Sequence, residues 1–249
     1  SYTINLIAQP QLNIFSDAND TDIITLCEDE LNFSPLVGDI LNIDTYLWSA
    51  TSGVGGFGGG QTTSNPTYTF TASDKAAGYV NLTLTGTNNT CGETTQDQLT
   101  INFQRNPVVS TGLTTVVLCS SIDQYSISTA SSSNTANTSW RVTGGSGTFS
   151  NPNTLITTYN PSPADRAGTN NPIIITLEGS PIGPCDDPAV DSFALIFDPA
   201  PVINMPSDQS ICENGTYQVN GITIDNNYDP TSISFTSTGR GSFSATANP

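Results

Sequence analysis

The chain has 249 residues, and only 11% of them are charged, against roughly 25% in ordinary globular proteins. Its net charge of −17 and its five Lys and Arg residues argue against nucleic acid and anionic membrane surfaces, which are bound mainly through basic side chains. No run of about 20 apolar residues could span a bilayer, so we expect no direct membrane insertion. The chain has no histidine, the commonest general base, and no acidic pair recurs at a predicted cleft. We therefore do not expect an enzyme.

One block of sequence occurs twice in full and begins a third time, which indicates an internal repeat. Two cysteines, Cys27 and Cys119, and two tryptophans, Trp48 and Trp140, are each 92 residues apart (119 − 27 and 140 − 48). The third copy opens at Cys212. The predicted organisation is a closing strand of a preceding repeat (1–10), repeat 1 (11–106), repeat 2 (107–200) and the opening half of repeat 3 (201–249).

Residues 1–10 alternate apolar and polar side chains, as a half-buried strand does, and we expect the chain to be cut from a longer protein. Repeat 1 is predicted to contain a helical turn at 73–77 and strands at 23–27, 32–40, 46–48, 67–71, 80–85 and 99–103. Repeat 2 matches strand for strand, with its helical turn at 163–167. About seven short strands per unit predict a β-sandwich. The predicted fold class is therefore all-β, with tandem Ig-like sandwiches in an elongated array joined by short, proline-containing connectors.

Each repeat has one tryptophan on its predicted third strand and one phenylalanine nine residues later, in a Gly-rich loop. Trp48 and Trp140 could stack against sugars, but a single tryptophan at this place is more often part of the core. We predict that both belong to the structural core, with Phe57 and Phe149 folding the loop tips back onto it. The loop lacks the Lys-Ser/Thr of a phosphate-binding loop.

Five cysteines occupy repeat-equivalent positions, which is typical of a disulfide framework. The spacing favours the pairs Cys27–Cys91 and Cys119–Cys185, which would close loops of 64 and 66 residues (91 − 27 and 185 − 119) and leave Cys212 unpaired. We expect each bond at one end of its sandwich. Disulfides indicate an oxidising compartment such as the cell surface or the medium. Buried free thiols in a cytosolic protein are the alternative.

Acidic side chains offer two candidate sites. Asp74 and Asp165 could act in catalysis or metal binding, but each stands in a predicted helical turn, where capping is the commoner role. The oxygen-rich stretch before the first cysteine could bind Ca²⁺, although it lacks the central glycine and distal glutamate of a full calcium loop. Its candidate ligands are Asp17, Asn19, Asp20 and Asp22. We predict no cofactor, with calcium at this stretch as the weaker alternative.

The segment TYTFTASDKAAGYVNLTLTGTNNTC (67–91) and its counterpart TYNPSPADRAGTNNPIIITLEGSPIGPC (158–185) resemble the second half of a polycystic-kidney-disease-type (PKD-like) β-sandwich. The usual PKD motif places Phe-Gly-Asp-Gly soon after the tryptophan, and this chain does not. Its combination of Trp, Gly-rich loop, Asp-Lys/Arg-Ala and paired cysteines resembles the tandem repeats of very large surface adhesins of gliding Bacteroidetes. That resemblance implies type IX secretion, display as a filament and movement by the cell-surface gliding machinery.

These observations predict a tandem-repeat segment of a large cell-surface adhesin, an extended filament that contacts the substratum and supports adhesion. The resemblance implies that the filament also supports gliding motility. The expected partners are external surfaces or polysaccharides and neighbouring repeats, together with the gliding machinery that the resemblance implies. Two alternatives remain: an accessory β-sandwich module of a secreted polysaccharide-degrading enzyme, and a structural sheath or surface-layer protein. All three hypotheses place the chain at the cell surface or outside the cell.

Overall fold

The computed structural model describes residues 2–15, 21–51, 55–64, 66–225, 229 and 232–243. The chain forms two compact units, and the sequence repeats do not coincide with them. The first unit contains Ser1–Val108, Ser132–Asn137 and Gly179–Ala189, and the second contains Val109–Ser131, Thr138–Glu178 and Val190–Pro249. Two segments of the second repeat's sequence therefore belong to the first unit. The predicted four-part division of the sequence itself stays a prediction.

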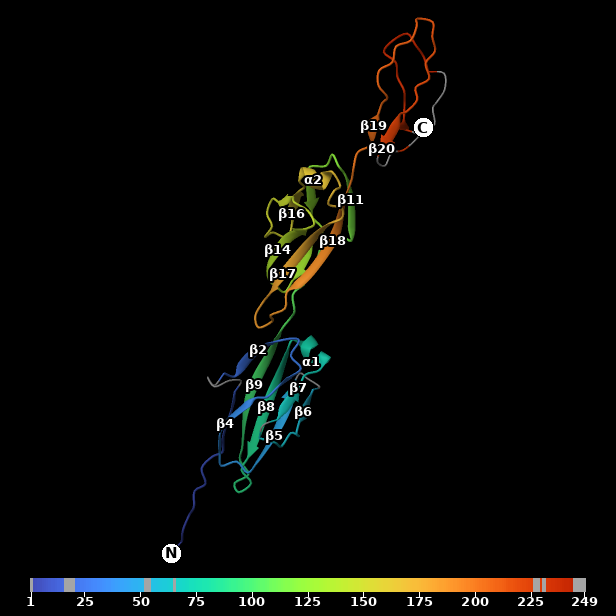
Figure 1. The fold of residues 1–249 in the computed structure, drawn as a ribbon. Helices are drawn as coiled ribbons and strands as arrows, with labels where there is room; N and C mark the ends of the chain where they lie inside the picture. The colour runs from blue at the N-terminus through green and yellow to red at the C-terminus, as the bar shows by residue number, and fades with distance from the viewer. Residues whose placement is uncertain are drawn as a thin grey trace. The chain divides into compact units, whose positions relative to one another are not determined.

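The first repeat folds as a β-sandwich of short strands with one helical turn (Figure 1). Its elements are β1 (Gln11–Phe15), β2 (Ile23–Cys27), β3 (Asn32–Phe33), β4 (Leu36–Leu41), β5 (Thr45–Thr51), β6 (Gly56–Gly58), β7 (Thr67–Thr69), α1 (Ala72–Ala77), β8 (Tyr79–Thr87) and β9 (Thr94–Gln104). One sheet has the order β2-β9-β8-β5, with β2 parallel to β9; the others are β3-β7-β6 and β1-β4.

The second repeat has the same topology, strand for strand. Its elements are β10 (Val108–Ser110), β11 (Thr115–Cys119), β12 (Tyr125–Ile127), β13 (Ser131–Ser133), β14 (Thr135–Thr143), β15 (Thr148–Phe149), β16 (Thr157–Asn160), α2 (Pro163–Arg166), β17 (Ile173–Pro181) and β18 (Ala189–Asp198). The sheets are β11-β18-β17-β14, β12-β16-β15 and β10-β13. After them, β19 (Val202–Asn204) pairs with β20 (Thr223–Asp225). The fold is therefore all-β with Ig-like sandwiches, as predicted.

Two details differ from the predicted elements. The strand expected over 32–40 is divided into β3 and β4 at Ser34–Pro35, because proline has no N–H to donate to a ladder. Residues 2–10 form no strand, and Tyr2 and Leu6 are each more than 90% exposed. In the described part of the chain, no sheet therefore covers the apolar side chains of this alternating segment.

The core of the first sandwich follows from the alternation along β8 and β9. Val80, Leu82 and Leu84 alternate with partly buried polar residues along β8, and Leu99 and Ile101 do so along β9. Every second side chain of a strand points to the same face, so these residues form one buried layer. Trp48 is the central residue of β5, which pairs with β8 in the same sheet, and it is fully buried with them.

The tryptophans lie in the interior of both repeats. Trp48 is fully buried, and its Nε1–H donates a hydrogen bond to the Thr63 carbonyl at 3.1 Å. Trp140 is 4% exposed and donates in the same way to the Thr154 carbonyl at 3.0 Å. A ring that is buried on both faces cannot stack against an external sugar. The buried indole N–H has its partner, so neither tryptophan offers a polar group for recognition.

The Gly-rich loops pack against these aromatic cores, and they contain the short strand β6 in repeat 1 and β15 in repeat 2. The ring of Phe57 lies 5.9 Å from that of Trp48, and Phe149 lies 6.1 Å from Trp140. A Cβ on Gly147 would come within 2.5 Å of the Tyr159 hydroxyl. Glycine is therefore needed at this position because the backbone passes directly over the tyrosine.

A buried carboxylate organises the same end of the second sandwich. Asp165 accepts hydrogen bonds from the N–H of Ser162 at 2.9 Å, the hydroxyl of Tyr159 at 2.9 Å, the N–H of Ser146 at 3.0 Å and the side-chain amide of Asn170 at 3.0 Å. Burial alone would raise the pKa of Asp165, but these hydrogen bonds outweigh it and hold the pKa well below its ordinary value. Asp165 is thus a structural anion that ties α2 to the loop.

Asp74 has the matching role in the first repeat. Its side chain accepts from the N–H of Thr71 at 2.8 Å and completes a capping box at the start of α1, as Asp165 does for α2. Both aspartates are fully buried inside a domain. They are positioned to stabilise a turn and have no exposed surface through which to meet a substrate.

Candidate functional site: the Cys27–Cys185 cluster

The candidate functional site is centred on a disulfide between Cys27 and Cys185, which are 158 residues apart. Cys27 ends β2, and Cys185 lies in the loop between β17 and β18. This loop is part of the segment Gly179–Ala189, which belongs to the first compact unit although its sequence belongs to the second repeat. The bond therefore connects the two sequence repeats covalently. The predicted pairs Cys27–Cys91 and Cys119–Cys185 are wrong.

The length of β9 explains why the predicted pair within repeat 1 is wrong. Cys27 is level with Gln104 at one end of this strand, whereas Cys91 precedes Thr94 at the other end. Ten residues of strand span roughly 34 Å. The Cα atoms of a disulfide must lie about 4–7 Å apart. The predicted pair in repeat 2 is separated in the same way along β18. Cys119 is level with Asp198 at one end of this strand, and Cys185 precedes Ala189 at the other end.

The other three cysteines have no disulfide partner within this chain. Cys91, Cys119 and Cys212 are free thiols, and all three are exposed. The observed pairing thus joins a strand-end cysteine of one repeat with a loop cysteine of the next repeat. Spacing within the sequence could not distinguish this arrangement from pairing inside each repeat, because both use one cysteine of each kind.

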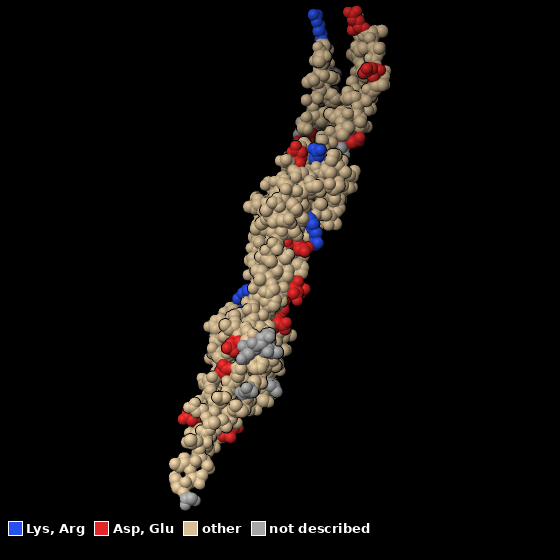
Figure 2. All heavy atoms as spheres, turned by 90° about the vertical axis from the view of Figure 1, so that its left-hand side faces the viewer, with Lys and Arg blue, Asp and Glu red and all other residues tan. Residues whose placement is uncertain are grey.

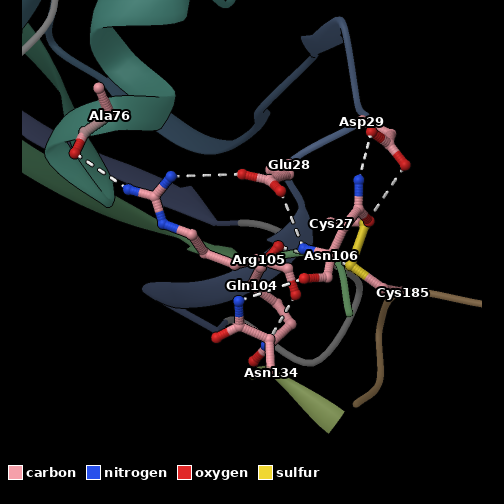
Figure 3. Close-up of polar contacts among 9 residues, drawn as sticks. All are labelled: Cys27, Glu28, Asp29, Ala76, Gln104, Arg105, Asn106, Asn134 and Cys185. Carbon is pink, nitrogen blue, oxygen red and sulfur yellow. Dashed lines mark hydrogen bonds and ion pairs between the residues drawn. A yellow bond between two sulfur atoms is a disulfide. The ribbon is translucent and has the colours of Figure 1, made fainter. Parts of the chain in front are cut away.

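The polar side chains around Cys27 hold the connector that leaves β9 (Figure 3). Glu28 accepts from the backbone N–H of Asn106 at 2.9 Å, and its second oxygen forms a 3.5 Å ion pair with Arg105. Arg105 also donates to the Ala76 carbonyl at the end of α1, at 3.2 Å. The ion pair is half exposed, so it contributes little stability by itself. The bond to the Asn106 N–H matters more, because it fixes the backbone just before Pro107.

Asn106 is the centre of this cluster. Its side-chain amide donates to Asp29 at 2.7 Å, and its backbone carbonyl accepts from the amide of Asn134 at 3.2 Å. Its side-chain oxygen lies 3.1 Å from the Sγ of Cys27, which has no proton to donate because it is bonded to Cys185. Figure 3 shows Asp29 and Asn106 beside the disulfide, with Asn134 bound to the Asn106 carbonyl. The connector is thus held by a hydrogen-bond network that lies beside the disulfide.

The sequence did not reveal the partners of the disulfide, but a recurring asparagine does mark the connector beside it. Asn42 and Asn134 are 92 residues apart, and both have a positive φ, at 57° and 54°. Each donates its side-chain amide to the carbonyl of the residue before a junction proline: Asn42 to Gln9 and Asn134 to Asn106. Asparagine tolerates this left-handed conformation better than most residues. An asparagine that recurs at the repeat spacing could have marked the connector contact.

The cluster has the chemistry of a structural clamp. Among the described residues, no group of three or more His, Cys, Asp or Glu side chains could hold a metal ion. Of the candidate calcium ligands, Asp17, Asn19 and Asp20 lie outside the described residues, and Asp22 lies within them. In the described ranges, neither helix has the length and apolar character of a membrane span. Figure 2 shows acidic side chains scattered over one face, with few basic ones among them.

No protein-family model matches the chain, and a search of curated proteins found no match. Solved structures share its general architecture. The domains EC22-24 of mouse cadherin-23 match at 13% identity and a TM-score of 0.45, covering 78% of this chain and 68% of that one. The D00-D0 domain of intimin matches at 12% identity and a TM-score of 0.41, covering 75% and 100%. The domains EC1-4 of Drosophila N-cadherin match at 18% and 0.43, covering 76% of this chain and 49% of theirs.

A tryptic map can test the disulfide, because the chain has only five Lys and Arg residues. Digestion without reduction, with free thiols blocked and Cys212 replaced by serine, should link peptide 1–75, which contains Cys27, to peptide 167–240, which contains Cys185. The peptides 76–105 and 106–141 should carry blocked thiols at Cys91 and Cys119. A link between 1–75 and 76–105 would instead support Cys27–Cys91 and contradict the structure.

Proposed function

We propose that this chain is a force-transmitting segment of a large cell-surface adhesin, in which tandem sandwiches form an extended filament outside the cell. The observation that carries the proposal is the disulfide from Cys27 of repeat 1 to Cys185 of repeat 2. A bond that joins successive repeats adds a second covalent connection beside the backbone, which is useful where the chain is pulled along its length.

Three further observations support this function. A stable disulfide favours an oxidising compartment, as found at the cell surface. The connector around Asn106 is held by its hydrogen bonds to the carboxylates of Glu28 and Asp29 and by the one it accepts from Asn134, and these bonds restrict its movement. The tryptophans are inside the sandwiches, which removes the observation that would favour a sugar-binding accessory module. The proposal extends to adhesion and gliding motility because the repeat motif resembles adhesins of gliding Bacteroidetes.

The experiment is a deletion of the gene in the source organism, with surface display of the wild-type protein followed by antibodies raised against this chain. We expect antibody labelling of intact cells, and we expect the deletion strain to lose attachment to glass and agar under shear. Loss of surface movement in the same strain would support the gliding part of the proposal. Normal attachment of the deletion strain, or labelling only after cells are broken, would overturn it.

A further inference from the structure

We propose that Cys119 is one half of a second disulfide of the same kind, and that its partner is the loop cysteine of the repeat that follows. The inference rests on the proposed function and deepens it by naming the partner: another repeat of this type, presenting a cysteine between its two long strands, as Cys185 is presented between β17 and β18. Cys119 is a free, exposed thiol, whereas its repeat-equivalent Cys27 is bonded. The bonded copy in the same molecule shows what such a cysteine binds.

The backbone around Cys119 reproduces the backbone around Cys27. Each ends a strand that is parallel to the last long strand of its repeat: Cys27 is level with Gln104 and Cys119 with Asp198. The N–H of the next residue donates to that same partner carbonyl, at 2.9 Å in repeat 1 and 3.0 Å in repeat 2. Three residues after each cysteine, an N–H returns to the cysteine carbonyl, at 3.1 and 3.0 Å.

The connector that follows is held in the same way in both repeats. In repeat 1 the N–H of Asn106 donates to the Glu28 carboxylate at 2.9 Å. In repeat 2 the N–H of Ala200 donates to the Ser120 hydroxyl at 3.0 Å. Glu28 and Ser120 each directly follow the strand-end cysteine, and Asn106 and Ala200 each directly precede a proline. The backbone that surrounds Cys27, where Cys185 is bound, is therefore repeated around Cys119.

The opposite end of repeat 1 carries the matching loop cysteine. Cys91 lies between β8 and β9, as Cys185 lies between β17 and β18, and it is free and exposed. Nearby, Asn42 donates to the Gln9 carbonyl just as Asn134 donates to the Asn106 carbonyl beside the bonded pair. Repeat 1 thus has the loop half of the arrangement as well as the strand half. Cys91 is assigned to a strand-end cysteine of a repeat before it.

The reaction is ordinary thiol–disulfide exchange. The thiols of Cys119 and of the loop cysteine lose two protons and two electrons as their Sγ–Sγ bond forms. A disulfide-bearing protein oxidant of the export compartment accepts them and becomes a dithiol. The exposure of Cys119 gives such an oxidant direct access to the sulfur. No other group is required.

The test is a disulfide map of the natural polypeptide, isolated from cells whose free thiols were first blocked with N-ethylmaleimide. After trypsin digestion without reduction, peptide 106–141 should be recovered linked through Cys119 to a peptide from the repeat that begins near Val202. The linked cysteine should stand between the two long strands of that repeat. A Cys119→Ser variant should leave one maleimide adduct on that loop cysteine and unchanged amounts of the Cys27–Cys185 link.

Three results would overturn the inference. They are recovery of Cys119 as the maleimide adduct, a link from Cys119 to any other cysteine, or the absence of a cysteine from that loop. The 249-residue chain supplies a control, because Cys91, Cys119 and Cys212 should give three reactive thiols per folded molecule and fewer would contradict their assignment. The result is distinct from that of the gene deletion: a filament that adheres through Cys27–Cys185 alone would fail this map and still pass the adhesion experiment.

Discussion

Reduction of a single disulfide should lengthen the mechanically unfolded chain by roughly 550 Å. The bond between Cys27 and Cys185 removes 158 residues from the path of a force applied to the two ends, and an extended chain spans about 3.5 Å per residue. With the bond intact, force passes directly from β2 to the loop before β18, so residues between the two cysteines cannot be pulled out. Single-molecule force spectroscopy with and without dithiothreitol measures the gain in contour length.

Matched variants separate this bond from the other cysteines. The double variant Cys27→Ser, Cys185→Ser should show the full contour length without reductant. The triple variant Cys91→Ser, Cys119→Ser, Cys212→Ser should keep the restriction, because these three are free thiols. The pairs predicted from the sequence would instead release two steps of roughly 220–230 Å each. Two such steps, or no change on reduction, would contradict the observed pairing.

Replacement of Asp165 by asparagine should destabilise the second sandwich by about 3–5 kcal/mol at pH 7. In wild type the Tyr159 hydroxyl and the N–H groups of Ser146 and Ser162 all donate to the Asp165 carboxylate. Asparagine replaces one carboxylate oxygen with an amide N–H₂, which is itself a donor. Several buried donors then lose a charged acceptor at once. Urea unfolding followed by Trp140 fluorescence, in a Trp48→Phe background, reports on the second sandwich alone.

The difference in the free energy of unfolding between wild type and the Asp165→Asn variant should shrink as the pH falls. Because the folded protein holds the pKa of Asp165 below its ordinary value, the carboxylate stabilises the fold at every pH above its unfolded value of about 4. That stabilisation is lost as the pH falls further, through the folded pKa, so the two proteins should converge only below about pH 4. The exposed Asp123→Asn variant is the control and should match wild type throughout. A difference that stayed constant down to pH 2.5 would rule out the carboxylate charge as its cause.

The sandwich fold could be predicted from the sequence because its signals are local. Alternation along 80–85 and a capped turn around Asp74 need no knowledge of distant residues. The disulfide could not be predicted in this way, because its partners depend on the length of β9 and on which compact unit the loop 179–189 joins. The Asn106 cluster gathers residues that are far apart in the sequence, from Asp29 to Asn134, and the asparagine that recurs at 42 and 134 marks just one of its contacts.

The position of Cys91 imposes an order on the maturation of this protein. During synthesis Cys91 follows Cys27 after 64 residues, long before Cys185 emerges, so an unfolded chain meets the wrong partner first (91 − 27 = 64). Closure of a loop favours the shorter separation. Once β9 pairs with β2, however, the strand holds Cys27 and Cys91 at its opposite ends and removes that choice. Folding of the first sandwich must therefore precede oxidation, and an export route that oxidised thiols before strands paired would yield misjoined chains.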